Sequence, residues 1–300
     1  MEALREGLAA LLEGLGDLAA VRTALDERVQ PMLRAIVDEE SDNRRKLYEL
    51  RADPAYQSAY TDPDPLVSIV IATVGRHELV SRALPSLLAQ SHSNVEILVV
   101  GDHSPPEVAE AIREIGDARV RYWNLTQRLV AHSDSRRSWL VGSTMARNEA
   151  ARRARGRWLL YFDDDDRLRP DSIARLLTVA REHQAEVSYG GFRQCDPDGR
   201  VTSHIAFPPQ WGNFAWPAAL VHGGLRFFER ELVATHLELP GDIYLLTRML
   251  RVGVRFAMLD DIVLDYFPSS RWQPNDGSGR PSVLASLTHH DGPGAEPRPR

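Results

Sequence analysis

Four consecutive aspartates directly after an apolar run constrain this chain more than any other feature. Residues 158–162 read WLLYF, and residues 163–166 are all aspartate. A short apolar run of this kind predicts a strand of a parallel sheet that is buried on both faces. Because burying unpaired carboxylates is costly, the aspartates are expected at the carboxyl end of that strand, where open α/β sheets bind their ligands.

Carboxylates crowded at one loop repel one another unless a cation neutralises them. Carboxylate oxygens are the ligands that Mg²⁺ and Mn²⁺ prefer, and these ions usually accompany a phosphorylated substrate. The alternative interpretation is an acidic turn that is simply solvated. The position of the cluster directly after a buried strand favours the metal site.

The composition excludes several classes of protein. Of the 300 residues, 43% are hydrophobic and 26% are charged, as in ordinary globular proteins. The net charge of −6 does not suggest nucleic acid or an anionic membrane as a partner. No apolar run approaches the roughly 18 residues needed to span a bilayer. The single cysteine, Cys195, excludes an internal disulfide framework, and without a secretory signal a cytoplasmic location is expected.

The first 50 residues have the pattern of an amphipathic helix. Leucines from Leu4 to Leu18 recur in steps of four and three, and the apolar stripe resumes from Leu25 to Ile36. This period is typical of a coiled-coil seam or a helical hairpin. The stripe is buried either on the chain's own core or in a homodimer through residues 1–50. Residues 51–65 contain three prolines and are predicted to be a linker.

From residue 66 onward, apolar strand patterns alternate with helical ones. Strands are predicted at residues 67–72, 95–100, 120–123, 158–162, 187–194 and 256–265. Helices are predicted at residues 78–89, 107–115, 143–155, 171–183, 227–235 and 243–252, and residues 196–224 are rich in loops. The alternation predicts an α/β fold with a mostly parallel sheet flanked by helices.

Polar residues also follow the first two predicted strands. Thr73 and Arg76 come after the first strand, and Asp102 comes after the second. In a doubly wound sheet these loops lie at the same edge as the aspartates. Neither a GxGxxG nor a Walker A motif is present. Asp242 precedes a predicted helix, where its simplest role is that of an N-cap.

Five segments in order resemble blocks of the family 2 glycosyltransferases with a GT-A fold. They read VSIVIATVGR, VEILVVGDHS, ARNEA, ARGRWLLYFDDDDRLRP and GDIYLLTRMLRVGVRFAMLDDIVLDY. The resemblance covers residues 66–268 and leaves residues 269–300, rich in Pro, Gly, Ser and Arg, as a partly disordered tail. It implies a GT-A domain preceded by an N-terminal helical extension.

The resemblance also implies an activity and a set of site residues. The expected reaction is inverting transfer of a sugar from a nucleotide-diphosphate donor, with a UDP-sugar favoured, to a hydroxyl acceptor. The DXD motif falls on Asp163, Asp164 and Asp165, with Mg²⁺ or Mn²⁺ held by Asp163 and Asp165. Asp164 corresponds to a position near the ribose or diphosphate. The remaining positions carried over are Thr73, Arg76, Asp102 and Arg147 for the nucleotide, and Asp242 for the general base.

Two departures from the family pattern keep alternatives open. Gly101 and Gly241 stand where the family often has additional acids. One alternative is a nucleotidyl- or phosphoryl-transfer enzyme that uses the same acidic site, and another is a catalytically degenerate GT-A scaffold. Asp260 and Asp261 are the next candidates for the base. His289 and His290, in the tail, are weaker metal candidates.

Overall fold

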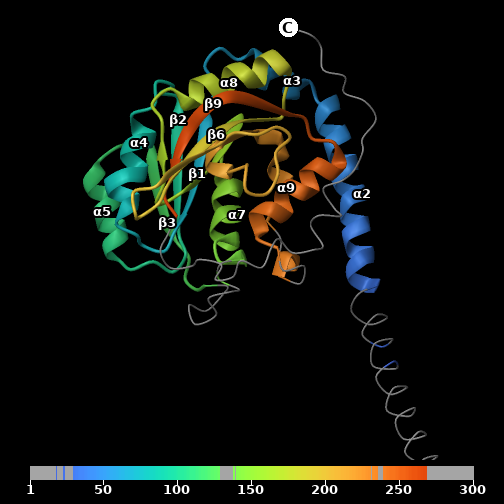
Figure 1. Ribbon diagram of the computed structural model, residues 1–300, viewed down its shortest axis with the longest axis horizontal. Coiled ribbons are helices and arrows are strands. Elements are labelled where there is room, and N and C mark those ends of the chain that lie inside the picture. Colours follow the sequence, from blue (N-terminus) through green and yellow to red (C-terminus); the bar gives the residue numbers. More distant parts are fainter. Residues whose placement is uncertain are drawn as a thin grey trace, which may run out of the picture.

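A nine-stranded sheet forms the centre of the described part of the molecule (Figure 1). The computed structural model describes residues 30–128, 138, 140–230, 232–235 and 239–268, together with Leu18 and Thr23. The strand order is β3-β2-β1-β4-β8-β6-β9-β5, and β7 pairs with β6. The strands are β1 (Val67–Thr73), β2 (Val95–Gly101), β3 (Val120–Asn124), β4 (Trp158–Asp163), β5 (Arg167–Leu168), β6 (Val187–Cys195), β7 (Val201–His204), β8 (Ala219–His222) and β9 (Phe256–Tyr266).

Helices cover both faces of this sheet. They are α2 (Gln30–Ala52), α3 (Pro54–Thr61), η2 (Leu79–Ala83), α4 (Leu84–Leu88), α5 (Glu107–Ile115), α7 (Thr144–Arg153), α8 (Ser172–His183), η3 (Trp216–Ala218), η4 (Gly223–Phe227), η5 (Leu232–Thr235) and α9 (Gly241–Val252). None of the described helices is long and apolar enough to cross a bilayer.

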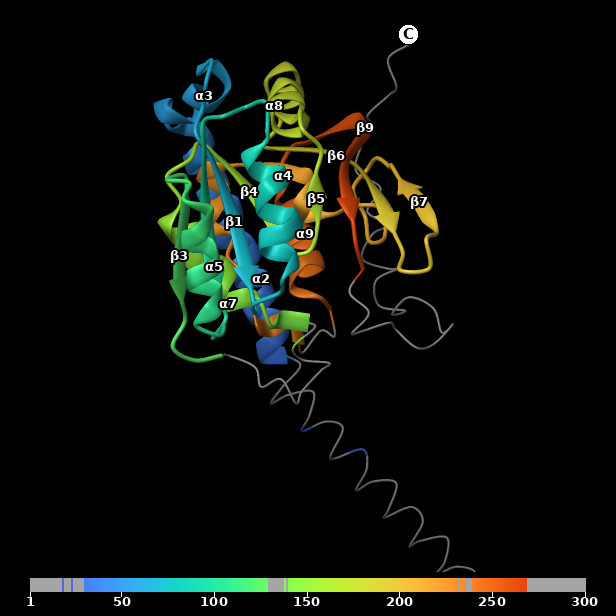
Figure 2. The same cartoon turned by 90° about the vertical axis from the view of Figure 1, so that its left-hand side faces the viewer.

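The sheet is mostly parallel, as predicted. Among the nine described strands, β1, β2, β3, β4, β6 and β9 run in one direction, and β5, β7 and β8 run in the other. Figure 2 shows β3 at one side of the molecule and the β6–β7 hairpin at the other. The carboxyl ends of β1, β2 and β4 therefore meet at one edge of the sheet.

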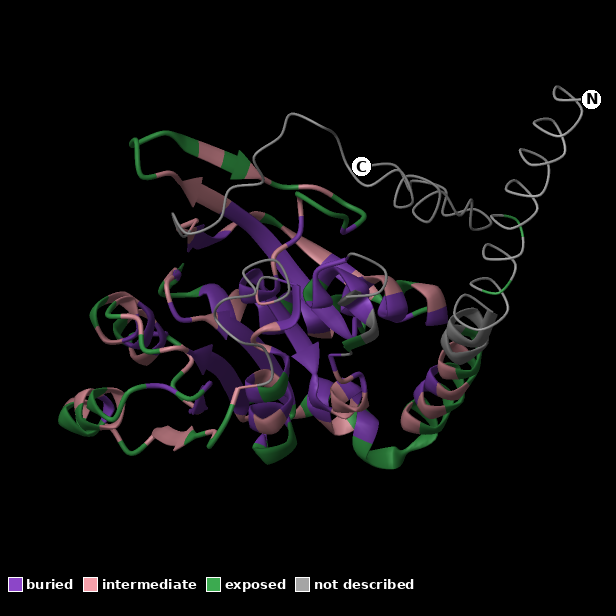
Figure 3. Cartoon of the chain, turned by 90° about the horizontal axis from the view of Figure 1, so that it is seen from below, coloured by how far each residue is buried: buried purple, intermediate pink, exposed green. Residues whose placement is uncertain are grey.

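Alternate residues of the central strands enter two separate cores. Ile69 and Ile71 of β1 pack with residues of α4, α5 and α8 on one face. Val70 and Ala72 pack with residues of α7, α9 and α2 on the other face. Figure 3 shows the sheet buried between these layers, with exposed residues on the outer helices and loops. Burial on both faces explains why these strands read as continuous apolar runs.

Residues 196–224 are rich in loops, as predicted, but they also contain β7 and β8, and β8 lies between β4 and β6 in the middle of the sheet. The predicted helix at 227–235 was wrong: η4 ends at Phe227, residues 228–230 are not helical, and residues 232–235 form the 3₁₀ turn η5. The backbone N–H of Arg230 donates to Asn148 Oδ1 at 2.9 Å, and the Arg230 carbonyl accepts from Asn148 Nδ2 at 2.9 Å. These bonds engage backbone groups that a continuous α-helix would use internally.

The predicted linker contains a helix that is part of the core. Tyr56, Ala59 and Tyr60 of α3 are buried. The indole Nε1 of Trp158 donates to the Ala59 carbonyl at 3.1 Å, and His222 stacks on Tyr60 with ring centroids 5.6 Å apart. Residues 51–65 therefore cover one end of β4 and β8.

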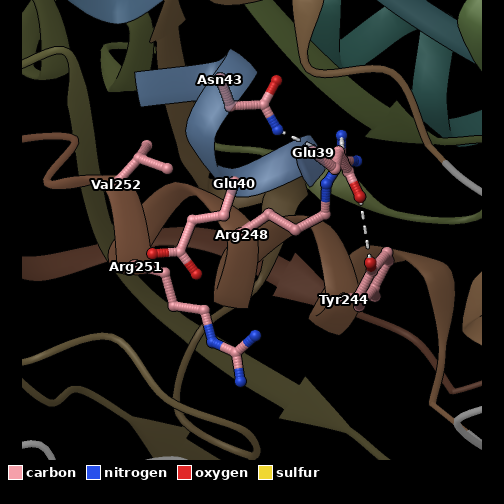
Figure 4. Close-up of a pocket in the computed structure, with 7 residues that line it drawn as sticks. All are labelled: Glu39, Glu40, Asn43, Tyr244, Arg248, Arg251 and Val252. Atoms are coloured by element: carbon pink, nitrogen blue, oxygen red, sulfur yellow. Dashed lines mark hydrogen bonds and ion pairs between the residues drawn. The ribbon is translucent and has the colours of Figure 1, made fainter. Parts of the chain in front are cut away.

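Helix α2 packs along α9, the helix that begins at Gly241. Figure 4 shows Glu39 of α2 among Asn43, Tyr244 and Arg248. Glu39 accepts from Tyr244 Oη and from Asn43 Nδ2, each at 3.2 Å, and forms an ion pair with Arg248. The second half of α2 is thus packed on the chain's own core. Most of residues 1–29, which carry much of the apolar stripe, lie outside the described residues.

Glu186 anchors α2 and α3 to the sheet from a fully buried position. Its carboxylate accepts from Arg51 at 2.6 and 2.8 Å, from Tyr56 Oη at 2.9 Å and from the Arg255 backbone N–H at 2.7 Å. Burial alone would raise its pKa, but these donors outweigh burial and hold the pKa of Glu186 below its ordinary value. The ionised form is therefore the one that the fold stabilises.

We expect Glu186→Gln to lower the free energy of unfolding by about 2 kcal/mol, because an amide leaves charged donors facing its own N–H₂ group. The loss is limited because Arg51 is partly exposed and solvent screens its charge. The stabilisation of the fold by ionised Glu186 is fully present above the ordinary pKa of a glutamate. It is lost as the pH falls through the lowered pKa of Glu186 in the folded protein. Urea unfolding at pH 7 measures it, with exposed Glu182→Gln as the control.

Candidate active site

The edge where β1, β2 and β4 end brings the predicted polar residues together. Thr73 is paired with Gly101 in the β1–β2 register, and Ala72 is paired with Asp163 in the β1–β4 register. The loops that follow these strands therefore start side by side. This is the edge at which open α/β sheets bind their ligands.

Asp164 is held by the first of these loops. Its side chain is buried and accepts from Thr73 Oγ1 at 2.6 Å and from Arg76 Nη1 at 2.7 Å. Burial raises the pKa of Asp164, and the Arg76 charge and the Thr73 hydroxyl oppose that rise. Thr73, Arg76 and Asp164 thus form one connected group.

Asp165 joins the same group through Arg76. Arg76 Nη1 lies 2.8 Å from Asp165 Oδ2, and Arg82 Nη1 donates to the Asp165 carbonyl at 2.7 Å. Burial and then the neighbouring Asp163 charge raise the pKa of Asp165 to about 7. Burial and the neighbouring negative charge thus both disfavour the ionised form of Asp165, and an added cation would favour it.

Asp163 is contacted from the opposite face of the sheet by α7. Arg147 forms an ion pair with its carboxylate and also donates through Nε to Ser143 Oγ at 3.0 Å. Burial would lower the pKa of Arg147, but the Asp163 carboxylate outweighs burial and raises it. The Asp163 side chain remains 30% exposed, which leaves it accessible to a ligand.

The fourth aspartate is part of the packing. Asp166 is completely buried, and its Oδ1 accepts from the Phe267 backbone N–H at 2.9 Å. The guanidinium of Arg82 lies 3.8 Å from the centre of the Phe267 ring. Burial, together with the charges of Asp163 and Asp165, raises the pKa of Asp166 well above its ordinary value. This carboxyl ties the end of β9 to the acidic loop.

Asp102 follows β2 beside this group. Its backbone N–H donates to the Thr73 carbonyl at 2.7 Å, so the two predicted nucleotide positions are adjacent. Arg128 Nε donates to the Asp102 carbonyl at 2.7 Å and lies 3.9 Å from its carboxylate. Arg136 and Arg137, in the basic loop after β3, lie outside the described residues.

Asp242 lies in the first turn of α9, on the same side of the sheet as α7. It is not the N-cap, because Pro240 holds that position and Asp242 Oδ1 accepts from the next backbone N–H, that of Ile243, at 2.8 Å. Its side chain keeps solvent-accessible surface. Loss of surrounding water nevertheless raises the pKa of its carboxyl, and the Arg230 charge opposes that rise. A carboxylate with exposed surface among protein charges suits proton transfer.

Electrostatic interactions connect Asp242 with the acidic loop. Asp163 raises the pKa of Asp242, and Arg147 lowers it. Trp216 Nε1 donates to the Asp242 carbonyl at 2.8 Å. The other candidates for the base are placed differently: Asp261 forms an ion pair with Arg175 of α8 at 2.7 Å, and Asp260 is exposed on β9.

The carboxylates of the acidic loop fit a divalent ion whose remaining coordination positions are filled by the substrate. Among the residues that the structure describes, no three His, Cys, Asp or Glu side chains are grouped as a closed metal centre. Mg²⁺ commonly takes one or two protein carboxylates and fills its other positions with water and phosphate oxygens. Of the four aspartates, Asp163 and Asp165 are only partly buried, whereas Asp164 and Asp166 are buried. His289 and His290 lie outside the described residues.

Sequence reasoning did not single out Arg230, Asn148 or Trp216 as site residues. Arg230 was assigned to a helix that does not form. It is 5% exposed, and its guanidinium lies 4.4 Å from the centre of the Tyr161 ring. The segment LRFFEREL at 225–232 holds two arginines and two glutamates among four apolar residues, so no local pattern distinguishes Arg230.

Comparisons with known proteins place the chain in a family. The model of Glycosyl transferase family 2 matches residues 68–237. The succinoglycan biosynthesis protein ExoO of Rhizobium meliloti is 33% identical over 139 residues, which are 46% of this chain and 36% of that protein. The glucosyltransferase WfaP of Escherichia coli, named for UDP-Glc and an α-D-GlcNAc-diphosphoundecaprenol acceptor, is 25% identical over 48% of this chain and 53% of its own.

Solved structures show the same fold. S. aureus TarS 1–349 matches with a TM-score of 0.53 and 16% identity, over 67% of this chain and 60% of that one. Its complex with UDP matches with a TM-score of 0.51 and 17% identity, over 68% and 60%. This chain spans roughly a third to a half of the length of the curated relatives described above. With the family match covering more than half of its 300 residues, the chain belongs to glycosyl transferase family 2.

Proposed function

We propose that this protein is a metal-dependent, inverting glycosyltransferase that moves a sugar from a nucleotide-diphosphate donor, preferably a UDP-sugar, to a hydroxyl acceptor. One observation carries the proposal. Asp163, Asp164 and Asp165 lie at the end of β4 in contact with Arg147 and Arg76, and Asp242 interacts electrostatically with the same group. The TarS structures in complex with UDP and UDP-GlcNAc support the class of donor.

Each group has a chemical role in this proposal. Asp163 and Asp165 hold Mg²⁺ or Mn²⁺, which when bound stabilises the negative charge of the departing diphosphate. Thr73, Arg76, Asp102, Arg147 and Asp164 position the nucleotide. Asp242 removes the proton of the acceptor hydroxyl as that oxygen attacks the anomeric carbon. Attack on the face opposite the diphosphate inverts the anomeric centre.

The raised pKa of Asp242 favours this role. A base accepts a proton more readily as its pKa approaches the working pH. Loss of surrounding water raises the pKa of the Asp242 carboxyl, and the Arg230 charge opposes that rise. Asp163 pairs with Arg147 and binds the metal, whereas Asp242 accepts the proton of the acceptor.

A donor screen tests the proposed function. The protein is incubated with a panel of nucleotide sugars in Mn²⁺ or EDTA, with and without sugar acceptors. We expect release of nucleoside diphosphate together with a glycoside of inverted configuration, both abolished by EDTA. Release of nucleoside monophosphate and sugar phosphate would instead support the phosphoryl-transfer alternative. The absence of any metal-dependent binding of nucleotide would support the scaffold alternative.

Homodimerisation through residues 1–50 is a separate proposal. It rests on the apolar stripe of residues 4–36, because α2 from residue 39 onward is occupied by the chain's own core. Light scattering of the full chain and of a chain that lacks residues 1–29 tests it, and the same number of subunits in both would contradict it. The acceptor and the cytoplasmic location also stay predictions.

A further inference from the structure

Arg230 is a buried cation with an unused hydrogen-bond donor. The residue is 5% exposed, and within the described part of the chain its Nη2 has no hydrogen-bond partner. Its guanidinium lies over the rings of Tyr161, at 4.4 Å, and Trp216, at 5.9 Å. Buried charges are normally paired, so this arrangement indicates a missing partner.

The surroundings hold Arg230 in place. Asn148 bonds to both its backbone N–H and its carbonyl, each at 2.9 Å. Asn148 directly follows Arg147, which pairs with Asp163. Trp216, the ring beneath the guanidinium, donates to the Asp242 carbonyl at 2.8 Å. The same small framework therefore positions a metal-binding carboxylate, the base and Arg230.

The charges around Arg230 indicate the sign of the missing partner. Burial and, after it, the nearby Arg147 cation lower the pKa of Arg230 to about 10, against the opposing effects of Tyr161, Asp242 and Asp163. Two guanidinium groups that repel each other in a buried place are stabilised by a shared anion. Asp163 is already committed to Arg147. An anion from a ligand therefore fits the unused N–H better than a neutral hydroxyl does.

We propose that Arg230 binds the β-phosphate of the donor and stabilises the diphosphate as it leaves. The inference rests on the proposed function and adds a residue to it. In the reaction, the acceptor oxygen bonds to the anomeric carbon and the bond from that carbon to the β-phosphate oxygen breaks. Its electron pair goes to the phosphate oxygen, and the acceptor proton goes to Asp242. Arg230 donates to the oxygen on which this charge develops.

A nearby arginine shows what a purely structural role looks like. Arg226 lies four residues earlier and donates to the carbonyls of Gly223, Ala154 and Gly156 at 2.7, 2.6 and 3.1 Å. Those bonds fix the chain around η4. Arg226→Met is therefore the matched control for Arg230→Met, because both remove a guanidinium from the same segment.

The test compares binding of UDP and UMP by calorimetry in Mn²⁺, because UMP lacks the β-phosphate. We expect Arg230→Met to weaken UDP binding roughly tenfold or more, as for loss of a charged hydrogen bond, and to leave UMP binding nearly unchanged. Arg226→Met should lower the melting temperature without changing the ratio of the two affinities. Retained UMP binding by Arg230→Met also demonstrates that the variant is folded.

Other outcomes would overturn the inference in distinguishable ways. If Arg230→Met binds UDP as tightly as the wild type, or loses UDP and UMP equally, Arg230 does not contact the β-phosphate. If it keeps UDP affinity and loses affinity only for a UDP-sugar, the contact is to the transferred sugar. If the wild type itself binds no nucleoside diphosphate, the proposed function fails together with this inference.

Discussion

Asp242→Asn is expected to lower kcat by about 10²-fold or more while the Kd of the donor stays nearly constant. Asparagine preserves the shape of the side chain and still accepts from the Ile243 N–H, so the start of α9 is kept. What is lost is the group that takes the acceptor proton. Single-turnover rates measured with saturating donor, beside calorimetric donor affinity, separate these two effects.

The control is Asp171→Asn, which changes another exposed aspartate at the start of a helix. It should leave both the rate and the donor affinity as in the wild type. If Asp242→Asn retains full turnover, the base lies elsewhere, and Asp260 and Asp261 become the next residues to replace. Equal loss of donor affinity and rate would show that Asp242 serves the donor rather than the acceptor.

The pH profile gives the same residue a second test. Only the ionised form of Asp242 accepts a proton, so kcat falls as the pH falls through its pKa. Loss of surrounding water raises that pKa, so the acidic limb should lie above the ordinary range of an aspartate. In Asp242→Asn this limb should disappear from the residual rate.

Asp165→Asn should remove the gain in UDP affinity that Mn²⁺ gives to the wild type. Asp163 and Asp165 are the proposed ligands of the ion, and an amide oxygen is a far weaker ligand than a carboxylate. Calorimetric titrations with UDP in Mn²⁺ and in EDTA measure the gain directly. Asp198→Asn is the control, since Asp198 is exposed and its carboxylate accepts from a local backbone N–H at 3.1 Å. An undiminished effect of Mn²⁺ would remove Asp165 from the set of ligands.

The strands of the parallel half were predictable because they are buried on both faces. The runs at 67–72, 95–100 and 158–162 form β1, β2 and β4 with ends that differ by one residue. The apolar run at 158–162 also placed the aspartates at the carboxyl end of β4. Their position beside Thr73 and Arg76 then followed from the direction of the strands, without any need for side-chain detail.

The rest depends on contacts between distant residues. Strand β8 has only four residues and is defined by its pairing with β4 and β6. The turn at Arg230 depends on Asn148, which is 82 residues earlier in the chain. The burial of Tyr56, Ala59 and Tyr60 depends on Trp158 and His222, which no local pattern connects with a proline-containing segment. Periodicity over neighbouring residues carries none of this information.

The hydrogen bonds that Glu186 accepts from Arg51 and Tyr56 determine where this chain can be truncated. A recombinant fragment that begins at residue 66, where the resemblance to the family starts, would lack α2 and α3. The Glu186 carboxylate and the Trp158 indole, which these helices cover, would then be exposed to solvent. The smallest fragment expected to remain intact therefore starts before Glu39, well upstream of the boundary that sequence similarity suggests.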